Sequence, residues 1–113
     1  MVKYVSVICR PPGTDRQETI AYWLTLHAPL VRRALAPDLR KYVINLAVQK
    51  PGATEPSYDA IVELHFDDMD SMNRAMSNPA WQSEERKKSS DRVIDYSRTK
   101  SYIVEENIIP LAV

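Results

Sequence analysis

The chain has 113 residues, 44% hydrophobic and 27% charged, which suffices for one domain with a hydrophobic core and is too few for two. Fifteen basic and fifteen acidic residues give a net charge of zero, so no overall field favours nucleic acid or an anionic membrane, and we expect neither partner. The single cysteine excludes an internal disulfide, no segment has the ~20 apolar residues of a membrane span, and no signal peptide is recognised, so we expect a cytoplasmic protein.

The first half of the chain predicts a strand, a helix and a second strand. Residues 2–10 are rich in β-formers and end at the turn signal Pro-Pro-Gly. Asp15 stands where a helix N-cap is expected, and apolar residues then keep helical spacing over residues 20–34. Pro29 lies inside this pattern and lacks a backbone donor, so we expect the helix to kink or restart just before it. Residues 40–50 alternate as a strand.

The second half predicts a strand, helical segments and a last strand. Residues 58–66 alternate between apolar and polar side chains and give the clearest strand of the chain. Residues 67–78 predict a helix whose methionines share one face, which we expect in the core, and the following proline predicts a second helical start. Residues 85–92 form the one basic cluster, ERKKSSDR, which is typical of a solvated helix end. Residues 100–109 predict the final strand.

The order β-α-β-β-α-β indicates an α+β protein with the ferredoxin-like fold, an antiparallel four-stranded sheet with helices on one face. We expect residues 1–113 to form this single domain. The second face of such a sheet would remain uncovered, and the predicted strands place large side chains on both faces. We therefore expect a homodimer that forms through sheet-to-sheet packing.

The segment AYWLTLHAP, residues 21–29, contains the main candidate for a catalytic group. His27 follows Trp23 by four residues, so both project from the same apolar helix face towards the sheet. A desolvated imidazole would be neutral near pH 7 and could accept and return a proton, while Trp23 and Tyr22 would offer flat walls to an aromatic substrate. The same pattern also describes a buried histidine in a filled core, and the spacing leaves both interpretations open.

A pocket around His27 would need further polar groups. Tyr42 and Asn45 have opposite parity on the second predicted strand, so only one of them can face the helices. Asp59 or Tyr58 is a candidate on the third strand, and Ser101 or Tyr102 on the fourth. Asp59 shares a strand face with Glu63 and His65, but residues on one strand face are spread over too long a line for three of them to converge on one ion, and we expect no metal. With only two glycines, no phosphate loop or dinucleotide fingerprint is possible, and we expect no cofactor.

Several segments resemble the EthD family of the dimeric α/β-barrel superfamily, and together they cover essentially the whole chain. They are RPPGTDRQETIAYWLTLHAPLV, LRKYVINLAV, YDAIVELHFDDMDSM, NPAWQ and DYSRTKSYIVEENII. The specific element is the block Tyr-Trp-xxx-His-Ala-Pro. The resemblance implies a ferredoxin-like chain that pairs its sheet with that of a second copy to form a barrel. Two positions depart from the family pattern: Ala60 stands where glycine is frequent, and Asn107 where histidine is frequent, which puts any role of that histidine in doubt here.

The resemblance also implies a function. Members of the family and its superfamily are associated with cyclisation, dehydration, decarboxylation, lactone isomerisation and oxygenation of aromatic or polyketide-like molecules. It therefore implies a cofactor-independent lyase or isomerase that acts by proton transfer on such a substrate, with His27 as acid and base. Tyr22, Trp23, Tyr42 and Asp59 would bind the substrate. Two alternatives stay open: a cofactor-free monooxygenase, and a non-catalytic accessory protein that binds a small molecule of a degradation or biosynthetic pathway.

Overall fold

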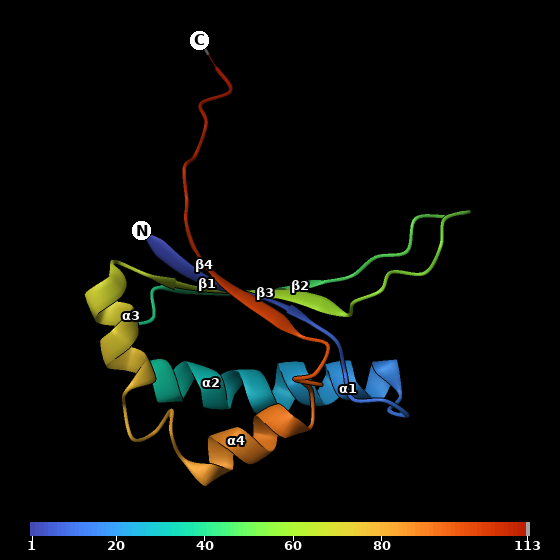
Figure 1. Cartoon of the computed structure of the whole chain (residues 1–113), viewed down its shortest axis with the longest axis horizontal. Helices are drawn as coiled ribbons and strands as arrows, with labels where there is room; N and C mark the ends of the chain where they lie inside the picture. Colours follow the sequence, from blue (N-terminus) through green and yellow to red (C-terminus); the bar gives the residue numbers. More distant parts are fainter. Residues whose placement is uncertain (113) are drawn as a thin grey trace.

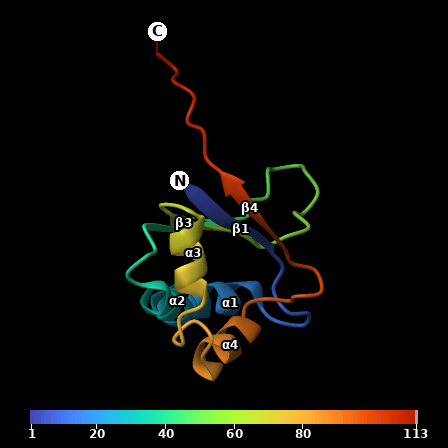
Figure 2. The ribbon, with the colours of Figure 1, turned by 60° about the vertical axis from the view of Figure 1, so that its left-hand side comes forward.

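The computed structural model describes residues 1–112 and contains a four-stranded antiparallel sheet with helices packed on one face (Figures 1 and 2). The strands are β1 (Val2–Ile8), β2 (Lys41–Leu46), β3 (Ala60–Phe66) and β4 (Lys100–Glu105), and their order across the sheet is β2-β3-β1-β4. The helices are α1 (Arg16–Tyr22), the π-helical turn η1 (Trp23–His27), α2 (Ala28–Leu35), α3 (Met69–Met76) and α4 (Glu84–Asp91). The two central strands are the first and third in sequence, so the predicted ferredoxin-like fold is confirmed.

β1 and β4 are shorter than the sequence pattern predicts, because the backbone groups beyond their ends do not bond to a neighbouring strand. β1 stops before Arg10, whose backbone N–H donates to the Asp59 carboxylate at 2.8 Å and not to a neighbouring strand. β4 stops at Glu105, which pairs with Val2 at the start of β1, so no strand remains for later residues to pair with. Beyond this point the chain runs away from the body of the molecule (Figure 1).

The first helical segment begins and is interrupted where the sequence predicts. The Asp15 side chain accepts a hydrogen bond from the Glu18 backbone N–H at 2.9 Å and caps α1. The interruption before Pro29 is a π-helical turn, in which the Ala28 backbone N–H donates to the Trp23 carbonyl. Pro29 cannot donate, and its ring would crowd the carbonyl four residues earlier, so the wider turn accommodates it without breaking the helix. α1, η1 and α2 thus form one continuous rod (Figure 1).

The second helical segment differs from the prediction in two respects. α3 begins at its Asp68 cap, but Met69 is 42% exposed, so the methionine row is only partly in the core, with Met72 buried. After α3 the chain makes turns, and α4 begins at Ser83, whose side chain accepts from the Arg86 backbone N–H. The predicted helical start at the proline is therefore several residues too early, because the serine side chain supplies the cap.

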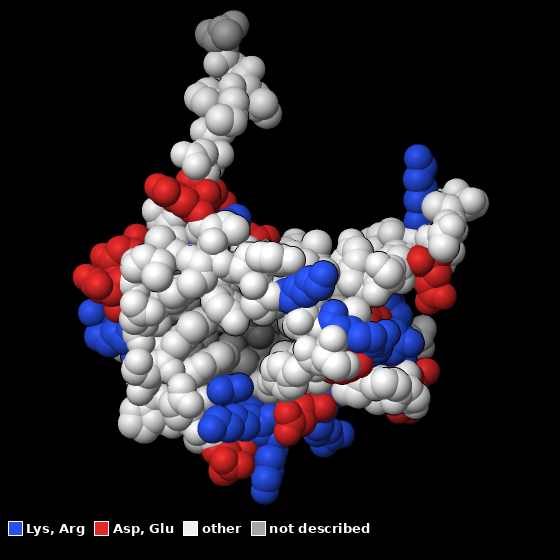
Figure 3. Space-filling model, in the orientation of Figure 1, with Lys and Arg blue, Asp and Glu red and all other residues white. Residues whose placement is uncertain are grey.

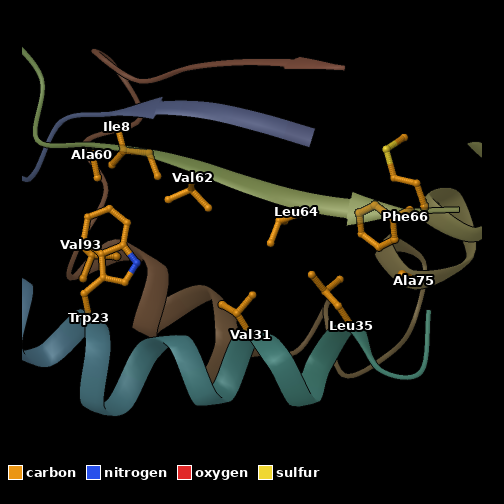
Figure 4. Close-up of a cluster of buried hydrophobic side chains, with 11 residues drawn as sticks. Ile8, Trp23, Val31, Leu35, Ala60, Val62, Leu64, Phe66, Ala75 and Val93 are labelled. Carbon is orange, nitrogen blue, oxygen red and sulfur yellow. The ribbon is translucent and has the colours of Figure 1, made fainter. Parts of the chain in front are cut away.

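The core lies between the rod of helices and the helix-facing side of the sheet. Figure 4 shows Trp23 and Val31 pointing up from the helix towards Val62 and Leu64 of β3. Every second residue of β3 faces this core, which confirms the alternation seen in the sequence. No helix of the described residues is long and apolar enough to cross a membrane.

Candidate functional site

A cavity of about 200 Å³ lies between the helices and the β1–β4 side of the sheet. Figure 3 shows this face of the molecule hollowed between the sheet and α4. The lining combines aliphatic and aromatic side chains with others that carry a polar group, namely Tyr4, Ser6, His27, Tyr42, Arg86, Ser90, Tyr96, Thr99 and Ser101. This mixture of an apolar surface and a small number of polar groups is typical of a small-molecule site.

The cavity exists because small side chains occupy the strand positions beneath it. On β3 the helix-facing residues include Leu64 and Phe66, which fill the layer against the rod. On the neighbouring strands the equivalent face carries Ser6 and Ser101, which pair directly and whose hydroxyl oxygens lie 2.8 Å apart. Two serines fill less space than two leucines, so the layer remains open there.

His27 is 4% exposed and lines the cavity. Its Nδ1 lies 2.7 Å from the Ser89 hydroxyl oxygen, so this ring nitrogen has a fixed partner on α4. The other ring nitrogen, Nε2, has no hydrogen-bond partner among the described residues. It is also partly accessible, because Nδ1 of His65 is the only side-chain nitrogen or oxygen of the described residues that is fully buried without a partner. Nε2 is thus the ring atom available to a molecule in the cavity.

The electrostatic environment keeps His27 uncharged. Burial, with a smaller contribution from the positive charge of Arg86, lowers the pKa of His27 to about 4. At neutral pH the imidazole therefore has a lone pair, as the sequence predicts for a desolvated histidine. The partner of Nδ1 is a side-chain hydroxyl and not a backbone carbonyl.

Of the predicted aromatic walls, Trp23 and Tyr42 line the cavity and Tyr22 does not. Burial raises the pKa of Tyr42 to about 12, so its phenol stays protonated. Tyr22 projects to the other side of Ser89, and its hydroxyl lies 3.0 Å from the Ser89 hydroxyl. Tyr22 therefore acts on His27 only through this serine.

Asp59 does not face the cavity. It lies just before β3 and binds Arg10 twice, through the backbone N–H of that residue and through its guanidinium. Asp59 and Arg10 instead line a separate polar hollow of about 370 Å³. The carboxylate is paired there, so Asp59 does not line the cavity in which it was expected to bind a substrate.

Sequence reasoning missed the contribution of α4, which was expected to be a solvated helix end. Arg86, Ser89 and Ser90 are all buried. They follow one another at helical spacing and continue to the fully buried Val93, so the stripe i, i+3, i+4, i+7 was present in the sequence. Its members are polar, and a search for apolar periodicity does not detect them.

Comparison with known proteins identifies relatives of this fold. The EthD domain model matches residues 11–96. Among proteins with curated functions, no sequence matches the chain significantly. The crystal structure of an EthD family protein from Bacillus halodurans superposes with a TM-score of 0.75 at 25% identity, covering 95% of this chain and 99% of that one.

Two further structures are similar in fold at lower identity. A dimeric ferredoxin-like protein of unknown function from Thermobifida fusca has a TM-score of 0.65 at 13% identity, covering 91% of this chain and 88% of that one. SnoaB from Streptomyces nogalater, described as a cofactor-independent oxygenase, has a TM-score of 0.65 at 10% identity, covering 98% of this chain and 97% of that one. These structures share the architecture over nearly the whole chain.

Proposed function

Because the chain belongs to the EthD family and has a neutral histidine in a small, mostly apolar cavity, we propose that it is a cofactor-independent enzyme. Its substrate is a small aromatic, polyketide-like or lactone molecule, and its reaction is a proton transfer of the lyase or isomerase type. The observation that carries the proposal is the arrangement around His27: Nδ1 held by Ser89, and Nε2 available to the cavity.

The hydrogen bonds give His27 a direction for proton transfer. If Nδ1–H donates to the Ser89 hydroxyl, that hydroxyl donates to Tyr22, and Nε2 presents its lone pair to the cavity. Nε2 then removes a proton from an acidic C–H next to a carbonyl, and the C–H electron pair becomes the π bond of the enolate. The imidazolium returns the proton to a departing hydroxyl in a dehydration or to a different carbon in an isomerisation.

The walls suit such a substrate. Trp23 offers a flat apolar surface and Tyr42 a phenol that stays protonated and can donate to a carbonyl oxygen. Because 200 Å³ lies below the volume of most drug-sized sites, the cavity favours a compound of one or two rings.

A solvent-exchange experiment tests proton transfer without the natural substrate. Wild-type protein in D₂O is incubated with 2-tetralone and with α-angelica lactone, and deuterium incorporation at the acidic carbon is followed by NMR. We expect exchange above the buffer rate, reduced at least ~100-fold in His27→Gln, a typical contribution of a positioned general base. The matched control is His65→Gln, since His65 lies on the opposite face of the sheet.

The same variants separate catalysis from binding alone. In a non-catalytic binding protein, neither compound would exchange above the buffer rate, although both would still bind in the cavity. If His27→Gln loses stability and exchange is unchanged per folded molecule, His27 is a core residue and the proposal is wrong. Cofactor-free oxygenation, the activity described for SnoaB, would appear as oxygen consumption by a deprotonated substrate, which an oxygen electrode measures.

We further propose that residues 1–113 act as a single domain and assemble as a homodimer through the uncovered face of the sheet. The Thermobifida fusca relative is described as dimeric. On β4 the face opposite the cavity carries Tyr102 and Val104, which are 51% and 37% exposed and would be covered by a second sheet.

A further inference from the structure

The cavity beside His27 contains a positive charge that forms no ion pair with a carboxylate of the described residues. Arg86 is 8% exposed, lines the cavity, and is the one buried arginine or lysine among residues 1–112. No aspartate or glutamate is among the cavity-lining residues, and Arg86 forms no ion pair within residues 1–112. By contrast, the exposed Arg74 pairs with Asp38 at 2.8 Å.

The guanidinium of Arg86 is held by uncharged groups. Its Nε donates to the Trp81 carbonyl at 2.6 Å, its Nη1 donates to the Ser90 hydroxyl at 3.2 Å, and its carbon lies 3.9 Å from the centre of the Trp81 ring. These contacts fix the plane of the group and leave N–H donors free. Tyr96, which is 58% exposed, also acts on the guanidinium and brings no negative charge, and the exposed Asp91 acts on it only through its charge, without an ion pair.

We propose that the cavity binds a molecule with an anionic oxygen, a carboxylate or a phenolate, and that Arg86 is its counter-ion. A buried charge without a partner is costly, and a planar guanidinium with free donors is the group best suited to bind a carboxylate or phenolate oxygen. The inference rests on the proposed function, since it names the substrate class of the same site.

An anion in this position also completes the chemistry of His27. Arg86 acts against protonation of the imidazole in the empty cavity. A negative charge bound between the Arg86 guanidinium and the imidazole would offset this effect, so Nε2 becomes a stronger base when the substrate is present. An enolate oxygen formed during proton removal would receive the same stabilisation.

Binding of matched probes tests the proposal by equilibrium calorimetry at low and moderate salt. 2-Naphthoate is compared with 2-naphthamide, and 4-nitrophenolate with 4-nitroanisole, so that the two pairs distinguish a carboxylate site from a phenolate site. In wild type we expect one or both anions to bind roughly 10- to 100-fold more tightly than the neutral partner, the strength of charge-assisted hydrogen bonds. In Arg86→Gln the two members of each pair should bind equally, and Arg86→Lys should retain part of the preference.

Arg92→Gln is the control, because Arg92 follows α4, is exposed, and lies over the Tyr22 ring outside the cavity. It should leave the preference unchanged. If the wild type binds the anion and its neutral partner equally, the role of Arg86 is wrong and the proposed enzyme is unaffected. This outcome does not depend on whether a variant folds. A preference that survives in folded Arg86→Gln would also overturn it. If no aromatic probe binds, this inference is wrong, while the proposed function is decided separately by the deuterium exchange of 2-tetralone and α-angelica lactone.

Discussion

The hydroxyl oxygen of Ser89 lies 2.7 Å from Nδ1 of His27 and 3.0 Å from the hydroxyl of Tyr22, so one serine on α4 joins a cavity residue to a residue outside it. Tyr22 and His27 belong to the helical rod, and Ser89 belongs to α4, far away in the sequence. The orientation of the imidazole is thereby fixed by a group that does not line the cavity.

Ser89→Ala should impair proton transfer and stability together. The substitution leaves Nδ1 of His27 buried without a partner, which costs about 1–3 kcal/mol in the free energy of unfolding. Loss of the fixed ring orientation should lower the deuterium-exchange rate roughly 10- to 100-fold in folded protein. NMR exchange and urea unfolding measure the two effects. Ser97→Ala, which removes an exposed hydroxyl bound to Asp95, should change neither.

The pH dependence of stability should reveal the buried imidazole. The folded pKa of His27 is about 4, below its ordinary value of 6.5, so between these values the unfolded chain binds a proton that the folded chain does not. Stability should therefore fall as pH decreases from about 6.5, by up to about 3 kcal/mol at pH 4. Hydrogen bonds from Asn45 and Lys3 lower the pKa of Glu63 to about 2. Protonation of Glu63 therefore reduces the stability only below its ordinary pKa of 4.5.

Urea unfolding followed by tryptophan fluorescence between about pH 4.5 and 7 isolates this contribution. His27→Gln should flatten the curve over this range, because glutamine does not titrate. An unchanged slope in the variant would mean that the imidazole is not desolvated in solution.

Asp59→Asn should destabilise the protein and leave proton transfer unaffected. The substitution removes the charge that pairs with the Arg10 guanidinium, and a loss of about 1–3 kcal/mol is expected for a hydrogen-bonded ion pair at this burial. The deuterium-exchange rate per folded molecule should equal that of wild type, since Asp59 lines the other hollow. A reduced rate with normal folding would assign Asp59 to the site after all.

Tyr102→Lys should convert the proposed dimer to a monomer. Tyr102 lies on the outer face of β4 opposite Val5, and a lysine there would place a charge inside a sheet-to-sheet interface. Sedimentation velocity measures the change, and Val48→Lys, in an exposed loop residue, is the control. A monomeric wild type would contradict the assembly itself.

Local signals in the sequence predicted most of the fold. The Asp15 cap, the alternation of β3 and the interruption before Pro29 each depend on residues close together in the chain, and all are present in the structure. The strand ends were overestimated because they depend on where a partner strand begins, as at Glu105, and the sequence does not contain that information.

The site was predicted only in part, because its polar groups come from different elements. Their opposite parity on the strand correctly predicted that only one of Tyr42 and Asn45 faces the helices. Tyr42 lines the cavity, whereas Asn45 binds Glu63 on the other face of the sheet. Ser89 and Arg86 were missed because a buried polar stripe inside a charged segment has the composition of a solvated helix. Only the packing of α4 against η1 shows which of its faces is covered.

The helical rod contains a π-helical turn from Trp23 to His27. This turn contains one residue more than the α-helical turn that it replaces, as the bond from Ala28 to Trp23 shows. A single-residue deletion there would restore a regular α-helical turn, and Val31 and Leu35 would still face the sheet. The core-facing register of α2 is thus insulated from a change of one residue in the segment that carries the imidazole.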